Sequence, residues 1–146
     1  MAPFRRVLHA TDFSPASRRA FRTAIGLARR LRARLILLHV MTPPSPFISE
    51  DAPSSSYTKL LAHARQAARR RLAGALARAR RAGIGASAVG TEGLPADEIL
   101  RTSRRQRVDL IVLGTHGRTG LRRAFIGSVA ERVVSQARCP VLTVRP

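Results

Sequence analysis

The sequence contains few of the residues that define several common protein classes. Its 146 residues include one cysteine, Cys139, so a disulfide framework is excluded and a reducing compartment is expected. Tryptophan is absent and aromatic residues make up 4% of the chain, too few to interleave with arginine in a surface that stacks nucleic-acid bases. No apolar run approaches the length of a membrane span, and no signal-peptide hydrophobic region is present. We therefore expect a cytoplasmic protein that does not enter a membrane.

Acidic residues are also scarce. The chain carries 8 Asp and Glu against 27 Lys and Arg, which gives a formal net charge of +19, and Lys59 is the single lysine. A charge of this size is typical of proteins that bind nucleic acid or another polyanion. The arginines are nevertheless spread over several segments of the chain, which favours solvated helix faces. Association with nucleic acid therefore stays open as the alternative function.

Hydrophobic periodicity predicts strands and helices in alternation. Apolar runs indicate strands at 5–10, 34–40, 83–89, 109–113 and 140–144. Apolar residues at helical spacing indicate helices at 16–32, 57–81, 95–106 and 128–137. The proline- and serine-rich segment 41–56 is predicted to be a loop, either a lid or a plain crossover. Length and alternation predict one α/β domain over residues 1–146, with a mostly parallel five-stranded sheet and helices on both faces.

A loop with several glycines follows the fourth predicted strand. Gly114 and Gly117 come directly after this strand, and Gly127 and Ser128 come before the next helix. A helix start of this kind presents backbone N–H groups and the positive end of the helix dipole to an anion. Gly114 and Gly117 can take positive φ angles and let the backbone come close to a ligand. We also expect Gly127 to leave room for a phosphate and Ser128 to cap the helix.

The spacing Gly114-x2-Gly117-x9-Gly127-Ser128 matches neither a P-loop nor the Rossmann G-x-G-x-x-G pattern. It resembles the nucleotide-binding signature of the universal stress protein family, in its ATP-binding branch. The segments GTHGRTGL and GSVAERVVSQARCPVLTVR are also similar to that family. The resemblance covers essentially the whole chain. It implies a doubly wound fold of the adenine nucleotide alpha hydrolase-like kind, with strand order 3-2-1-4-5 and a ligand at the switch point between strands one and four.

The same resemblance implies which residues contact ATP. The adenosine end is assigned to four residues at the ends of strands one and two: Ala10, Thr11, Asp12 and Val40. The ribose and phosphates are assigned to Leu113, Gly114, His116, Gly117, Arg118, Gly127, Ser128 and Val129. The Asp12 carboxylate can accept hydrogen bonds from ribose hydroxyls, and it could at the same time shape an Asx turn. For Val40 the structural alternative is a place in the core.

The sequence leaves the enzymatic activity open. No convincing general base accompanies the loop, so we expect at most slow ATP hydrolysis. Magnesium or manganese could arrive with ATP, ligated mainly by phosphates and water, since no histidines have metal-ligand spacing with a carboxylate. His9 and His39 are expected to be packed and hydrogen-bonded in strands, and Cys139 to be buried rather than reactive. Finally, VLTVRP predicts an exposed edge strand, through which the resemblance implies a homodimer.

Overall fold

The structure is a computed structural model that describes residues 4–43, 54–116 and 126–146. Its strands are β1 (Arg6–Ala10), β2 (Arg34–Met41), β3 (Ala86–Glu92), β4 (Leu110–Gly114) and β5 (Val141–Val144). Its helices are α1 (Pro15–Leu31), α2 (Ser54–Arg81), α3 (Pro95–Arg105) and α4 (Ser128–Gln136). The predicted alternation of strands and helices is confirmed.

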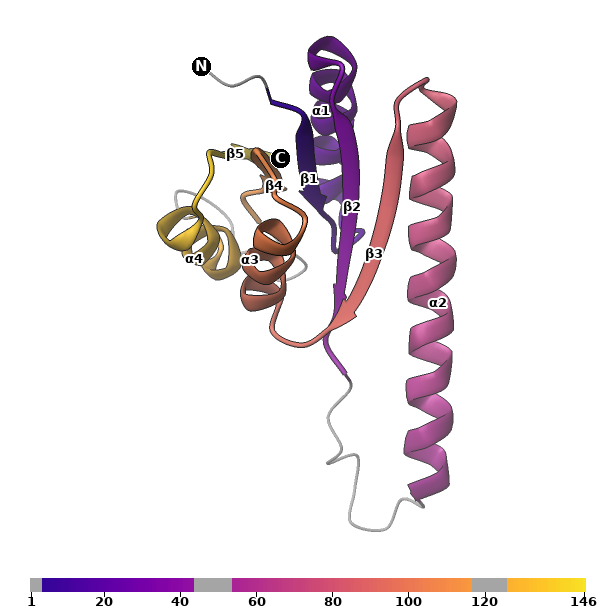
Figure 1. Cartoon of the computed structure of the whole chain (residues 1–146). Helices are drawn as coiled ribbons and strands as arrows, with labels where there is room; N and C mark the ends of the chain where they lie inside the picture. The colour runs from indigo at the N-terminus through magenta and orange to yellow at the C-terminus, as the bar shows by residue number, and fades with distance from the viewer. Residues whose placement is uncertain (1–3, 44–53, 117–125) are drawn as a thin grey trace.

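The five strands form one sheet in the order β3-β2-β1-β4-β5, and all four strand pairings are parallel. The predicted order is therefore correct. The chain builds outward from β1 to β3 and then returns to place β4 on the other side of β1 (Figure 1). The helices that follow β1 and β4 pack on opposite faces, so a crevice opens between these strands at their carboxyl ends.

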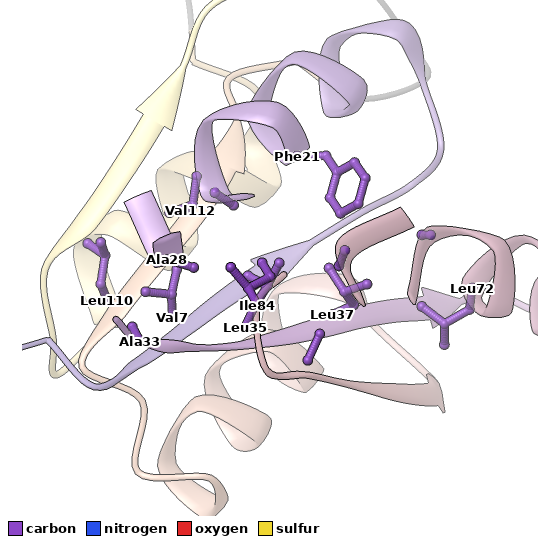
Figure 2. Close-up of a cluster of buried hydrophobic side chains, with 14 residues drawn as sticks. Val7, Phe21, Ala28, Ala33, Leu35, Leu37, Leu72, Ile84, Leu110 and Val112 are labelled. Carbon is purple, nitrogen blue, oxygen red and sulfur yellow. The ribbon is translucent and has the colours of Figure 1, made fainter. Parts of the chain in front are cut away.

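The sheet lies between two layers of helices. α1 and α2 cover one face, and α3 and α4 cover the other (Figure 1). Figure 2 shows the core on the α1 and α2 side, where Phe21 of α1 and Leu72 of α2 belong to one cluster with strand residues such as Leu37. Because both faces are covered, a central strand must be apolar along its length. This accounts for β2, in which residues 35–39 are all buried.

Two element boundaries differ from the prediction. α2 begins at Ser54, inside the segment predicted as a loop, because serines that disfavour a helix interior are tolerated in an exposed first turn. Residues 44–53 of that segment, and with them the predicted lid, lie outside the described residues. β3 starts later than predicted, since Gly83 has a φ of 77° and ends the preceding helix. It also continues to Glu92, which pairs with the last residue of β2, Met41.

The first turns of α1 and α3 carry residues that stabilise a helix start. Ser14 caps α1 by accepting a hydrogen bond from the Ser17 N–H at 3.2 Å, and Pro15 follows it. Asp97 and Glu98 lie in the first turn of α3. Cys139 was predicted to be buried and is only half-buried. This partial burial, followed by the charge of Asp109, raises the pKa of its thiol. None of the described helices has the length and hydropathy that crossing a bilayer requires.

Candidate functional site

A cavity of about 770 Å³ lies at the carboxyl ends of β1, β2 and β4. It brings together site residues that the sequence predicted from three separate parts of the chain: Ala10, Thr11, Asp12, Val40, Leu113, Gly114, His116, Gly127, Ser128 and Val129. Gly117 and Arg118 lie outside the described residues. The cavity occupies the switch point between β1 and β4, where doubly wound domains hold their ligands.

The turn between β1 and α1 forms one wall of the cavity. Asp12 Oδ1 accepts the Ser14 N–H at 2.9 Å, so the Asx turn considered for this residue is present. Thr11 Oγ1 accepts the Phe13 N–H at 3.0 Å and the Ser17 hydroxyl at 2.8 Å. These bonds fix the turn locally, and they hold the Asp12 carboxyl group at the cavity wall.

Phe13 is a cavity residue that the sequence did not indicate. Its φ of 62° is left-handed, a conformation that costs an aromatic residue of order 1–3 kcal/mol. The centroid of the Phe13 ring lies 4.5 Å from that of the His39 ring. The Arg71 guanidinium also packs on Phe13, at 5.7 Å from the ring centroid. A strained residue held between two packed side chains is typical of a functional site. Nothing in the local sequence TDFS predicts this conformation.

The glycines have roles that differ from those predicted. Among the described glycines, positive φ occurs at Gly83 and Gly93, so Gly114 does not use the positive φ that was open to it. Gly114 is the last residue of β4, and strand geometry keeps its φ negative. Gly127 also has an ordinary φ, of −60°. Its N–H donates to the Thr115 carbonyl at 2.6 Å, and a Cβ here would lie 3.0 Å from that same oxygen. Glycine is needed at 127 because two backbone segments meet there.

The start of α4 lies next to this contact. Gly127 is the N-cap, and Ser128 is the first helical residue rather than the predicted cap. The N–H groups of a first helical turn have no acceptor within the helix. Here they belong to Ser128, Val129 and Ala130, all of which line the cavity. The ion pair between Arg132 and Asp97, 2.7 Å long, ties this turn of α4 to α3.

Three histidines lie in or near the site. His9 and His39 are packed and hydrogen-bonded, as predicted: their Nδ1 atoms lie 3.0 Å from the Val112 carbonyl and 2.8 Å from the Thr11 carbonyl. Burial lowers the pKa of His9 to about 4, although the Val112 carbonyl and the charge of Asp12 act in the opposite direction. His116 lines the cavity with Nδ1 at 2.9 Å from Thr115 Oγ1, while its buried Nε2 has no hydrogen-bond partner within the described part of the chain.

A second wall of the cavity comes from the apolar stripe of α2, a helix to which the sequence gave no role in the ligand site. The α2 residues that line it are Leu60, Ala64, Ala67, Ala68 and Arg71. Leu60 is 43% exposed, whereas Leu72 near the middle of α2 is 8% exposed. The amino-terminal half of the stripe therefore faces the cavity instead of the sheet. Both halves of α2 carry leucines and alanines at the same helical spacing, so the sequence pattern does not predict this difference.

Metal ligands do not cluster in the described ranges 4–43, 54–116 and 126–146, where no group of three His, Cys, Asp or Glu could hold an ion. The chemical groups at the cavity include a carboxylate, a guanidinium, two histidine rings, hydroxyls, helix-start amides and apolar side chains. This set can bind a ligand that has both an apolar portion and an anionic portion.

The parallel sheet and its switch-point cavity define a Rossmann-like, doubly wound α/β domain. The chain belongs to the universal stress protein family, whose sequence model matches residues 3–145. Universal stress protein MJ0531 of Methanocaldococcus jannaschii is 35% identical over 97% of this chain and 82% of its own length. The structure of universal stress protein UspA from Lactobacillus plantarum is 29% identical with a TM-score of 0.78, covering 99% of this chain and all of that one. A universal stress protein solved in complex with cAMP is 25% identical with a TM-score of 0.71, and 98% of each chain is covered.

Proposed function

We propose that this chain is an ATP-binding universal stress protein whose occupancy by nucleotide regulates a stress response. The observation that carries the proposal is the cavity itself, in which residues predicted from three distant parts of the sequence converge at the switch point. The similar universal stress protein solved with cAMP supports an adenine nucleotide as the ligand class.

The adenosine portion would lie between β1, β2 and α2. Val40 and the small side chains of α2 offer an apolar surface for the adenine ring, and Phe13 adds an aromatic one. The Asp12 carboxyl group lies on the same wall, where it can accept hydrogen bonds from ribose hydroxyls while Oδ1 keeps its bond to Ser14. The Asx turn therefore orients a carboxylate that serves the ligand as well.

The phosphates would lie at the start of α4. The N–H groups of Ser128, Val129 and Ala130 belong to the first turn of α4, and a negative charge is favoured at such a helix N-terminus. The Gly127 N–H is already used by Thr115, so Gly127 contributes close backbone packing rather than a phosphate ligand. Magnesium or manganese would enter with the nucleotide, held by phosphate oxygens and water.

Hydrolysis would be slow, because cleavage of the γ-phosphate requires a group that positions or activates water. Asp12 is assigned to the sugar end. His116 is the remaining described titratable side chain near the phosphate end of the cavity, and we assign it a contact role. The nucleotide would then act as a regulatory ligand rather than a rapidly consumed substrate.

Calorimetric titration of ATP with magnesium tests this function. We expect saturable binding that Gly127→Val weakens at least about a hundredfold, since the new side chain displaces the start of α4 from Thr115. Gly26→Ala is the matched control: a Cβ at Gly26 meets nothing within 4 Å, so binding should be unchanged. Absence of ATP binding to the folded wild-type chain would disprove the proposal.

A homodimer through β5 is part of the same proposal. β5 is the last strand of the sheet and pairs with β4 on one side. Its residue Leu142 is 37% exposed, and an uncovered edge strand invites pairing with a second copy. Leu142→Lys should convert a dimer into a monomer in sedimentation analysis, and a monomeric wild-type chain would show this assignment to be wrong.

A further inference from the structure

A second cavity lies at the opposite edge of the sheet, where the parallel strands begin. Its volume is about 430 Å³. The residues that line it are Arg6, Arg34, Ile36, Ser87, Arg105, Gln106 and Arg107. They come from the starts of β1, β2 and β3 and from the end of α3, at the end of the sheet near the N-terminus in Figure 1. We call it the arginine cavity, after Arg6, Arg34, Arg105 and Arg107.

The strand register places two of these arginines side by side. Arg6 and Arg34 are direct partners in the parallel pairing of β1 and β2. Ile36 and Ser87 are partners in the pairing of β2 and β3. Since side chains two residues apart share a sheet face, Arg34 projects from the same face as Ile36, which packs against α3. Like charges opposite each other on neighbouring strands destabilise a sheet, so this arrangement has a cost when no anion is present.

The end of α3 brings the other two arginines to the same place. The Val108 N–H donates to the Ser103 carbonyl at 2.9 Å, which closes the helix end, and Arg107 takes a left-handed φ of 49° within this turn. The Arg6 guanidinium donates to the Gln106 carbonyl at 3.0 Å and so links the start of β1 to the turn. The cavity is thus fixed by backbone geometry on both sides.

Among the residues that the structure describes, no carboxylate lines the arginine cavity. The three salt bridges within the described residues involve Arg65, Arg101 and Arg132, none of which lines it. Asp109 follows the turn, but its Oδ2 accepts the backbone N–H groups of Arg5 and Arg6 at 2.9 and 2.8 Å. Four arginines therefore line the cavity, with no carboxylate among the described lining residues.

We infer that the arginine cavity binds a small polyphosphate, a ligand with several phosphate groups and no base. Guanidinium groups form paired hydrogen bonds to phosphate oxygens, and Ser87 and Gln106 add neutral donors. Within residues 4–43, 54–116 and 126–146, no aromatic side chain lines the cavity, so these residues offer a nucleobase nothing to stack on. The lining is a compact hollow rather than the extended positive stripe that tracks a nucleic-acid backbone. This site is separate from the proposed ATP site, which lies at the other edge of the sheet.

Titration of the whole protein with sodium triphosphate, followed by amide NMR shifts at about 150 mM salt, tests this site. We expect saturable shifts at Ser87, Gln106 and Arg107. The double variant Arg34→Gln and Arg107→Asn should weaken binding at least about tenfold, and asparagine tolerates the left-handed φ at 107. Arg105→Gln, at an exposed position, is a second variant that should weaken binding in the same direction.

The control is the double variant Arg22→Gln and Arg30→Gln. It makes the same change in net charge at two exposed positions of α1, on the other face of the sheet, and it should bind triphosphate as the wild type does. Equal weakening in both double variants, or shifts that spread over the surface without saturation, would overturn the proposal. So would a DNA duplex that shifts the same amides at lower concentration than triphosphate. Shifts at Gly114 and Gly127 on adding ATP report the proposed function separately.

Discussion

Two stacks of arginine, phenylalanine and histidine lie under α2, and they differ in what surrounds them. In the first, Arg78 lies 5.5 Å from the centroid of the Phe21 ring, which is 5.6 Å from the His9 ring. In the second, Arg71 lies 5.7 Å from the centroid of Phe13, which is 4.5 Å from the His39 ring. Since the arginines are seven residues apart, or about two helical turns, α2 makes the same contact twice.

The surroundings give the two stacks different functions. Phe21 and His9 are buried, and around them the carboxyl-terminal half of α2 places Leu72, Ala75 and Ala79 in the core. The three side chains of the second stack all line the switch-point cavity. One helix therefore stabilises the fold with one half and forms a binding surface with the other. Similar contacts in the two halves do not imply similar contributions to stability.

Truncating a leucine in each half should separate the two roles most clearly. Leu72→Ala removes a side chain that is 8% exposed and should lower the free energy of unfolding by about 2–5 kcal/mol. Leu60→Ala acts on a side chain that is 43% exposed and should lower it by no more than about 1 kcal/mol. Urea unfolding of both variants measures the difference. Equal losses would mean that the two halves of α2 pack alike.

The buried histidine of the first stack should make stability depend on pH. Burial lowers the pKa of His9 to about 4, against 6.5 for an exposed histidine, so the unfolded chain binds more protons between these values. The contribution of neutral His9 to the free energy of unfolding is complete above about pH 6.5 and is lost as the pH falls towards 4. At pH 4 the loss should be on the order of 3 kcal/mol.

The variant His9→Asn provides the control for this pH dependence. An asparagine amide can still donate to the Val112 carbonyl, so the variant should be less stable at every pH because of lost volume, with a flatter profile between pH 6.5 and 4. Chemical unfolding at several pH values tests this. A wild-type profile parallel to that of the variant would show that His9 is not the group responsible.

The fold could be predicted because its signals are local. Buried strands are apolar, helix starts carry Ser14 or Pro95, and strands that alternate with helices form parallel sheets. The resemblance to the family assigned Asp12, Val40 and Gly114 to the cavity. The strand pattern supported this for Asp12 and Gly114, because each lies at or next to the carboxyl end of a parallel strand and such ends share one edge of the sheet. The spacing of the glycines then predicted that the start of α4 also belongs to the ligand site.

The other features of the two cavities depend on contacts between distant segments, and a local sequence pattern carries no information on such contacts. Gly127 needs to be glycine because of the Thr115 carbonyl, not because of its own φ. The stripe of α2 has one period throughout, yet the sheet ends beneath it and leaves Leu60 beside a cavity. The arginines looked dispersed in the sequence, and strand register and the turn after α3 bring Arg6, Arg34 and Arg107 together.

The smallest expected effect tests the stacks directly. Arg78→Gln removes a cation above the buried Phe21 ring and should lower the free energy of unfolding by about 0.5–1 kcal/mol. Arg71→Gln removes the equivalent cation above Phe13, at the cavity, and should change stability by less than about 0.5 kcal/mol. It should instead weaken ATP binding about threefold, because a ring that stacks on a ligand loses the cation that holds it. Thermal unfolding and calorimetry of both variants give the two readouts. If Arg78→Gln weakened ATP binding as much as Arg71→Gln, the contacts would act through the helix as a whole and the division of α2 into two halves would be wrong.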